Sequence, residues 1–211
     1  MPTQRRLSFP IASLSLGGVC VLMIAASSCA EHNEPEIESN MGAWSRLDTN
    51  SLDGTNEALA QRARAAQNTL GSQLMGELSD AIAEQGTPGA IEVCSQIAPA
   101  IARRVSDEHG LRIGRTSWRL RNPDNSPPVW ARPSVERRVE TQRVWRHESG
   151  TLAMLTPIRV SALCLQCHGS DEQISDETRA RLDELYPEDD ATGFAAGDLR
   201  GWFWVEVDPE G

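Results

Sequence analysis

Two cysteines and a histidine stand close together in the segment Cys164-Leu165-Gln166-Cys167-His168. This spacing is typical of covalent c-type haem attachment, in which both thiols add to vinyl groups and the histidine binds the iron. A chance match is one alternative, and half of a zinc site is another. A structural zinc needs about four Cys or His ligands, but the sequence has no second Cys-x-x-Cys pair. We therefore expect one covalent haem c, provided that the protein is exported.

The N-terminal residues have the pattern of an export signal. Arg5 and Arg6 precede a mostly apolar run over residues 11–26, which small residues follow. A charged start, an apolar stretch and a zone of small residues together are typical of a secretory signal. A transmembrane helix usually requires about 20 apolar residues, and this run is shorter. We expect residues 1–28 to be a signal peptide.

Cys29 follows the predicted signal directly, as the lipid-bearing cysteine of bacterial lipoproteins does. Ala26 stands where that pattern prefers Leu, and ordinary cleavage without a lipid is the alternative. Residues 29–56 are acidic and polar with little apolar periodicity, which predicts a flexible tether. We expect an exported protein on the periplasmic side of a bacterial membrane, held there by a lipid on Cys29.

The overall charge is acidic. The formal net charge is −10, and it becomes −12 once Arg5 and Arg6 are removed with the signal. Such a balance argues against a nucleic-acid partner. About 180 residues remain after the signal, which is enough for one domain with a core of its own.

Apolar periodicity predicts helices first and strands later. Residues 55–85 and 88–108 have the period of amphipathic helices, separated at Gly86. Further helices are expected over residues 136–145 and 178–186, and strands over residues 111–117, 152–158 and 201–207. This order predicts an α+β domain over residues 57–208, with long N-terminal helices and an antiparallel sheet.

Cys94 lies on the apolar side of the second predicted helix and is left unpaired once the other cysteines are assigned. Pro99, five residues later, cannot donate a backbone hydrogen bond and clashes with the Ser95 carbonyl, so the helix should bend after the cysteine. Most buried thiols are simply small apolar core residues. The alternative is that Cys94 is an axial thiolate ligand of the haem iron.

Several motifs, in this order and at these approximate separations, resemble a family of exported single-haem c-type domains. They are Ala90-Ile91-Glu92-Val93-Cys94, Gly114-Arg115-Thr116-Ser117, Leu120-Arg121-Asn122-Pro123, the haem motif with Gly169, and Gly197-Asp198-Leu199-Arg200-Gly201. The resemblance implies a PAS-like sensor fold, which in this family stands alone or serves histidine kinases and chemoreceptors. It also implies covalent haem on Cys164 and Cys167, with His168 and Cys94 as the axial ligands.

Other residues remain candidates for roles at the haem. Met154, His147 and His109 are the alternative distal ligands. Arg115, Arg119 and Arg121 could bind the haem propionates through bidentate hydrogen bonds, or could be ordinary solvated arginines.

Two functions are compatible with these residues. The first is a haem-based redox or small-ligand sensor that acts through an unidentified signalling partner. The alternative is a small periplasmic electron-transfer cytochrome c with an unidentified redox partner. We do not expect an enzyme, because the sequence offers no catalytic carboxylate pair, Ser-His-Asp arrangement or phosphate-binding glycine loop.

Overall fold

The computed structural model describes residues 42–209. The predicted signal peptide, Cys29 and the first part of the predicted tether lie outside this range. Within it, none of the helices combines the length and the apolar character needed to cross a membrane.

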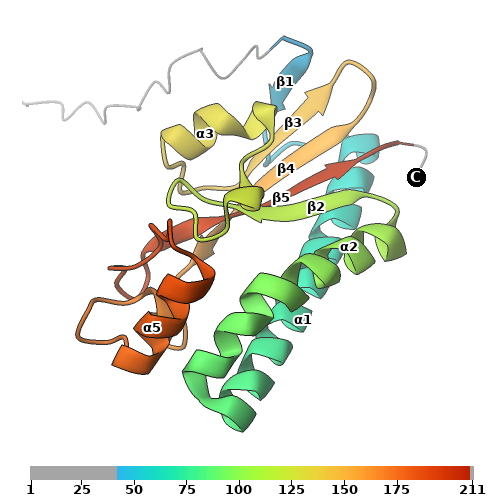
Figure 1. Ribbon diagram of the computed structural model, residues 1–211. Helices are drawn as coiled ribbons and strands as arrows, with labels where there is room; N and C mark the ends of the chain where they lie inside the picture. Colours follow the sequence, from blue (N-terminus) through green and yellow to red (C-terminus); the bar gives the residue numbers. More distant parts are fainter. Residues whose placement is uncertain (1–41, 210–211) are drawn as a thin grey trace, which may run out of the picture. The chain divides into compact units, whose positions relative to one another are not determined.

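A helical hairpin forms the first half of the domain (Figure 1). α1 spans Gly54–Glu92 and begins at the Asp53 N-cap, whose side chain accepts from the backbone N–H of Asn56. Gly86, at a φ of 71°, interrupts the helical backbone and turns the chain back, so the helical residues after it run beside those before it. The π-helical turn η2 (Val93–Ile97) and α2 (Ala98–His109) complete the returning arm. The two predicted helices and their separation at Gly86 are confirmed.

The irregular turn η2 contains Cys94. Its backbone hydrogen bond runs from Ala98 to the Val93 carbonyl, five residues back, so the turn is wider than in an α-helix. Pro99 lies two residues after η2 and has no N–H to give to the Ser95 carbonyl. In a regular helix its ring would also clash with that carbonyl. The predicted bend after Cys94 therefore takes the form of a widened turn that carries the cysteine.

An antiparallel five-stranded sheet forms the second half, in the order β1-β3-β4-β5-β2. Its strands are β1 (Trp44–Leu47), β2 (Arg112–Thr116), β3 (Arg143–His147), β4 (Leu152–Arg159) and β5 (Leu199–Val207). All neighbouring strands pair antiparallel. The short helices η3 (Pro123–Asn125), η4 (Val129–Ala131), α3 (Arg132–Glu136), α4 (Leu165–His168) and α5 (Asp176–Leu185) lie in the connections.

Each face of the sheet is covered. The helical hairpin packs on one face, where Leu70, Ile101 and Val105 meet Met154 and Val205 in the main core. A tryptophan-rich core covers the other face: Trp130, Ala131, Val135, Trp145, Ala153, Leu155, Leu199 and Trp202. The α+β prediction with long N-terminal helices is confirmed, while the PAS-like resemblance stays a prediction.

Two segments differ from the sequence predictions. Trp44–Leu47, inside the predicted tether, forms β1 and pairs with β3. The helix predicted over residues 136–145 is wrong, because α3 ends at Glu136 and Arg143–His147 is β3. Val144 and Trp145 are fully buried between neighbouring strands, so tertiary pairing outweighs the local periodicity.

The remaining predicted elements are present. β2, β4 and β5 occupy the three predicted strand positions, each within a few residues. α5 matches the last predicted helix, and the Ser175 hydroxyl caps it by accepting from the backbone N–H of Thr178.

Candidate cofactor site

The Cys-x-x-Cys-His segment forms one short helix after β4. α4 runs from Leu165 to His168, with Cys164 at its N-cap. The backbone N–H of His168 donates to the Cys164 carbonyl at 2.9 Å, and this bond closes the one helical turn that carries both thiols. Cys164 and Cys167 are both free and half-buried. One turn of helix therefore presents two thiols and an imidazole together.

One hydrogen bond orients the His168 imidazole. Its Nδ1 lies 2.6 Å from the carbonyl oxygen of Ala191. Because a carbonyl can only accept, Nδ1 carries the proton and Nε2 keeps its lone pair. Burial, and then the charges of Arg121 and Arg200, lower the pKa of His168 well below its usual value. The imidazole is therefore neutral at physiological pH, the form that binds a metal ion.

Arg121 connects the motif helix to the segment that follows α5. Its Nη2 donates to the Cys167 carbonyl at 2.5 Å, and its Nε donates to Oδ2 of Asp189 at 2.9 Å. Asp189 in turn accepts from the backbone N–H of Ala191 at 2.8 Å. Since the Ala191 carbonyl binds His168, this ion pair fixes the imidazole through a single intervening residue.

The same segment also pairs with the end of α4. The backbone N–H of Gly193 donates to the Gly169 carbonyl at 2.7 Å, and that of Phe194 donates to the His168 carbonyl at 2.9 Å. The Phe194 ring meets the imidazole edge-on, with 6.4 Å between their centroids. His168 is thus held through its backbone as well as its ring.

Cys94 approaches the motif from the helical hairpin. It is free and half-buried. Burial raises the pKa of the Cys167 thiol to about 11, the charge of Arg121 opposes this rise, and Cys94 and Cys164 add to it. The thiols of Cys94 and Cys167 therefore lie within electrostatic reach of each other, although 73 positions separate them in the sequence.

Polar contacts join the hairpin to the motif side. The Thr87 hydroxyl donates to Oε1 of Gln166 at 2.8 Å, and Arg181 on α5 lies 3.7 Å from Glu92. An apolar cluster lies in the same region and consists of Ile91, Ile174, Leu182 and Tyr186, with Cys167 packed against it. The hairpin and the motif helix therefore form one joint site.

Two guanidinium groups beside this site have no carboxylate partner among the residues that the structure describes. Arg115 makes no hydrogen bond or ion pair with any residue in the range 42–209. Burial lowers the pKa of Arg115, and the charges of Cys94 and Tyr186 oppose that shift. Burial, followed by the charges of Arg121 and Arg115, lowers the pKa of Arg200 to about 10. Asp189 pairs with Arg121, so this region keeps an excess of positive charge.

These groups fit a covalent haem. The two thiols of α4 could carry it, and the free Nε2 of His168 could bind the iron. Arg115 and Arg200 are part-buried, and two propionates could neutralise their charge, because removing a charge from water without a partner is unfavourable. The Cys94 thiol, on the widened turn of the hairpin, could be a further soft ligand.

The three arginines predicted as propionate contacts lie in different surroundings. Arg115 lies near Cys94. Arg121 is buried and donates to the Cys167 carbonyl. Arg119 lies 3.4 Å from Asp190 and stacks 4.8 Å above the Phe194 ring. Their contact with propionates stays a prediction.

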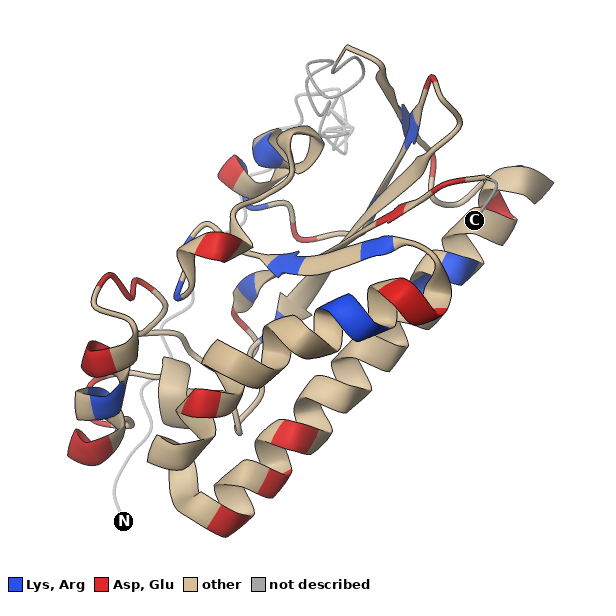
Figure 2. Ribbon diagram, turned by 45° about the vertical axis from the view of Figure 1, so that its right-hand side comes forward, with Lys and Arg blue, Asp and Glu red and all other residues tan. Residues whose placement is uncertain are grey.

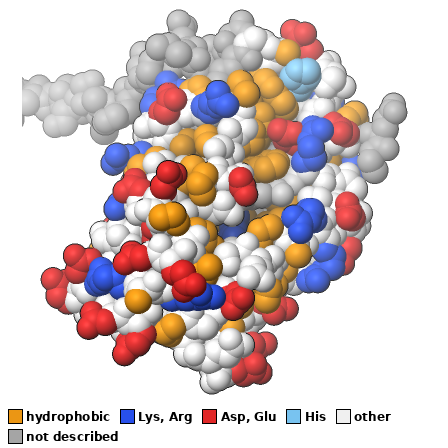
Figure 3. All heavy atoms as spheres, viewed as in Figure 1, with side chains coloured by type: hydrophobic (Ala, Val, Ile, Leu, Met, Phe, Trp, Pro, Cys, Tyr) orange, Lys and Arg blue, Asp and Glu red, His pale blue; other side chains and the backbone are white. Residues whose placement is uncertain are grey.

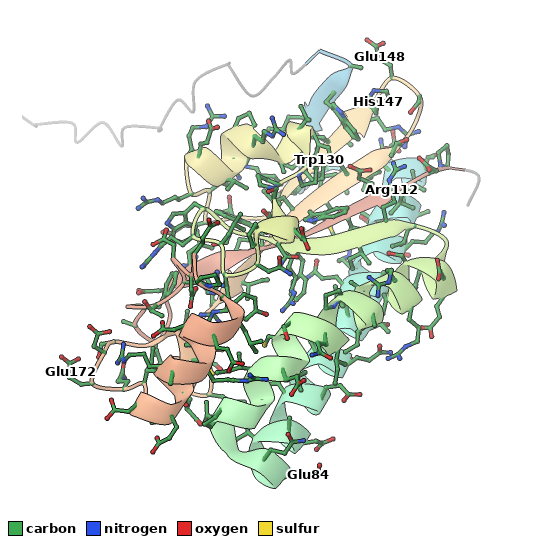
Figure 4. All side chains as sticks on the ribbon, viewed as in Figure 1. Glu84, Arg112, Trp130, His147, Glu148 and Glu172 are labelled. Atoms are coloured by element: carbon green, nitrogen blue, oxygen red, sulfur yellow. The ribbon has the colours of Figure 1, made fainter. Side chains whose placement is uncertain are left out.

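The alternative axial ligands lie elsewhere. Met154 is fully buried in the main core, where Nε2 of Gln142 donates to its sulfur. His109 ends α2. His147 stacks beside Trp44 at the end of β3, and Figure 4 places it across the domain from Glu172, four residues after His168. The structure therefore brings Cys94, and none of these three, to the motif.

Sequence reasoning missed several residues of the site. Arg200, Tyr186 and Asp189 come from three segments whose convergence depends on the tertiary fold. Arg200 had a signal, because it stands in one of the ordered motifs. Nothing local distinguishes Asp189 from the carboxylates around it.

We expect Arg121→Gln to lower the free energy of unfolding by about 3 kcal/mol, because it leaves the Asp189 carboxylate buried without its partner. Urea unfolding of the purified protein measures this loss. Arg64→Gln is the matched control: its partner Glu57 is part-exposed, and the loss should stay below about 1 kcal/mol. Equal losses in the two variants would contradict a bracing role for Arg121.

Comparison with known proteins identifies the family of this chain. The profile of the Tll0287-like family matches residues 46–208. A search of curated proteins finds no match. Among solved structures, the cyanobacterial haem protein Tll0287 is similar, with a TM-score of 0.56 and 22% identity over 72% of this chain and 95% of that chain. By the extent of the profile match, this protein belongs to the Tll0287-like family.

Proposed function

We propose that this protein binds one covalent haem c and acts as an exported redox or small-ligand sensor, with His168 and Cys94 as axial ligands. The observation that carries the proposal is the convergence of the Cys164, Cys167 and His168 turn with Cys94 and with Arg115, which has no ion-pair partner within residues 42–209. Membership of a family whose solved neighbour is a haem protein supports it.

Bound haem iron supplies reversible one-electron chemistry and, where a coordination position opens, binding of small diatomic ligands. The chain's own residues would set which of these dominates. A thiolate is a soft, anionic ligand that stabilises ferric iron, and Arg115 beside Cys94 would moderate that charge. The Nδ1–H of His168, bonded to Ala191, would keep the imidazole aligned on the iron.

The position of Cys94 favours the sensor. It lies on a widened helical turn, and such turns are common at functional sites. The arm that carries it is linked to the motif side by the Thr87–Gln166 hydrogen bond and the Glu92–Arg181 ion pair. Loss of the cysteine from the iron would shift this arm and strain both contacts, so a change at the metal would reach the hairpin.

The alternative is a small electron carrier. Half-burial of Cys164 and Cys167 would bring a haem edge near the surface. Carboxylates surround this end of the domain: Figure 2 shows them on α5 and on the hairpin end of α1, and Figure 3 shows them gathered over α5. Such a rim would steer a basic redox partner.

We also propose that the protein reaches the periplasmic side of a bacterial membrane and is held there by a lipid on Cys29. The motif supports this location, because c-type haem attachment fits an exported chain. The partner that receives the signal or the electron would then be membrane-bound or periplasmic.

Covalent attachment is tested first. We expect the protein, purified from a host that exports and assembles c-type cytochromes, to keep one haem per chain after denaturation, as mass spectrometry measures. Cys164→Ala with Cys167→Ala should lose the haem on denaturation, whereas Cys94→Ala should retain it. Haem retained by the double variant would contradict attachment through this motif.

Carbon monoxide distinguishes the sensor from the carrier. If Cys94 leaves the iron on reduction, the dithionite-reduced protein should bind carbon monoxide, with a shift of the Soret band. Cys94→Ala is the positive control, because its coordination position is open in both oxidation states. Binding by the variant and none by the wild type would favour the carrier.

A further inference from the structure

An open groove of about 520 Å³ lies beside the start of β5. Its walls include Trp118, Phe194, Arg119 and Arg138. The volume falls within the range of about 300–1,000 Å³ that is usual for small-molecule sites. None of the thiols of the cofactor site lines it.

Aromatic rings form one side of the groove. Trp118 and Phe194 meet edge-on, with 6.0 Å between their centroids. The fully buried Trp202 packs against Trp118, with 5.6 Å between the ring centroids. Phe194 lies against His168, so a single ring separates the groove from the motif histidine. Trp118 is part-exposed and can contact a flat aromatic ligand. Phe194 is buried beneath the guanidinium groups of Arg119 and Arg200, so it supports Trp118 from within the wall.

Arg138 supplies a cation at this aromatic wall. Its guanidinium carbon lies 5.2 Å from the Trp118 ring centroid, and its side chain makes no hydrogen bond or ion pair within residues 42–209. Its backbone φ is 54°, the one left-handed value outside glycine in that range. This value is that of a left-handed helix cap at the end of α3, where the backbone N–H of Val139 donates to the Ser134 carbonyl at 3.0 Å.

The carboxylates of the groove are already engaged. Asp190 lies 3.4 Å from Arg119, and Glu140 lies 3.0 Å from Arg159. Asp198 accepts from the backbone N–H of Ala195 at 2.7 Å. Arg138 is therefore left as the cation at the groove that has no anionic partner among the described residues.

We propose that this groove is a second binding site, for a flat aromatic molecule that carries one anionic group. The aromatic body would pack on Trp118, and the anion would bind the guanidinium of Arg138. The inference goes beyond the proposed function, because it requires neither a haem nor Cys94. If the haem is present, a ligand here lies one ring away from its histidine.

The test is calorimetric titration of the purified, haem-bearing protein with naphthalene-2-sulfonate, and with naphthalene-2-methanol as the uncharged analogue. We expect the sulfonate to bind at one site and the alcohol to bind at least tenfold more weakly. Arg138→Asn should weaken sulfonate binding about tenfold. Asn tolerates the left-handed backbone, so this variant should fold.

Arg132→Asn is the matched control. It removes the same charge from an exposed position on α3 that does not line the groove, and sulfonate affinity should stay at the wild-type value. The proposal is overturned if the sulfonate does not bind at millimolar concentration. It is also overturned if Arg138→Asn leaves the affinity unchanged, or if the alcohol binds as tightly as the sulfonate.

Discussion

The buried ion pair between Arg121 and Asp189 is the interaction on which the site depends. Arg121 donates to the Cys167 carbonyl of the motif helix, and Asp189 accepts from the backbone N–H of Ala191. Ala191 then fixes the His168 ring. A buried pair of this kind contributes little net stability but is costly to break. Its value here lies in holding an imidazole in one orientation and one tautomer.

The opposite side of the site depends on a different constraint, the proline in the returning arm of the hairpin. Pro99 is incompatible with a regular turn before it, and the chain responds with the widened turn that carries Cys94. The histidine side of the site is held by hydrogen bonds, and the cysteine side has an irregular backbone. The proposed ligand-switching sensor would use this difference, whereas a carrier would need both sides to stay fixed.

Much of this architecture could be predicted from the sequence. The two helices of the hairpin and three of the strands follow from local periodicity. β1 and β3 could not be predicted in this way, because β1 is held by its pairing with β3, and β3 by its pairing with β1 and β4. The ion pair between Arg121 and Asp189 could not be predicted for the same reason, because its two residues are 68 positions apart in the sequence.

The central claim is that Cys94 and His168 bind the same iron. Electron paramagnetic resonance of the ferric protein, recorded beside Cys94→Ala and Met154→Leu, tests it most directly. We expect a low-spin spectrum of thiolate type in the wild type and in Met154→Leu, and its loss in Cys94→Ala. A ferric spectrum that is identical in the wild type and in Cys94→Ala would contradict the claim.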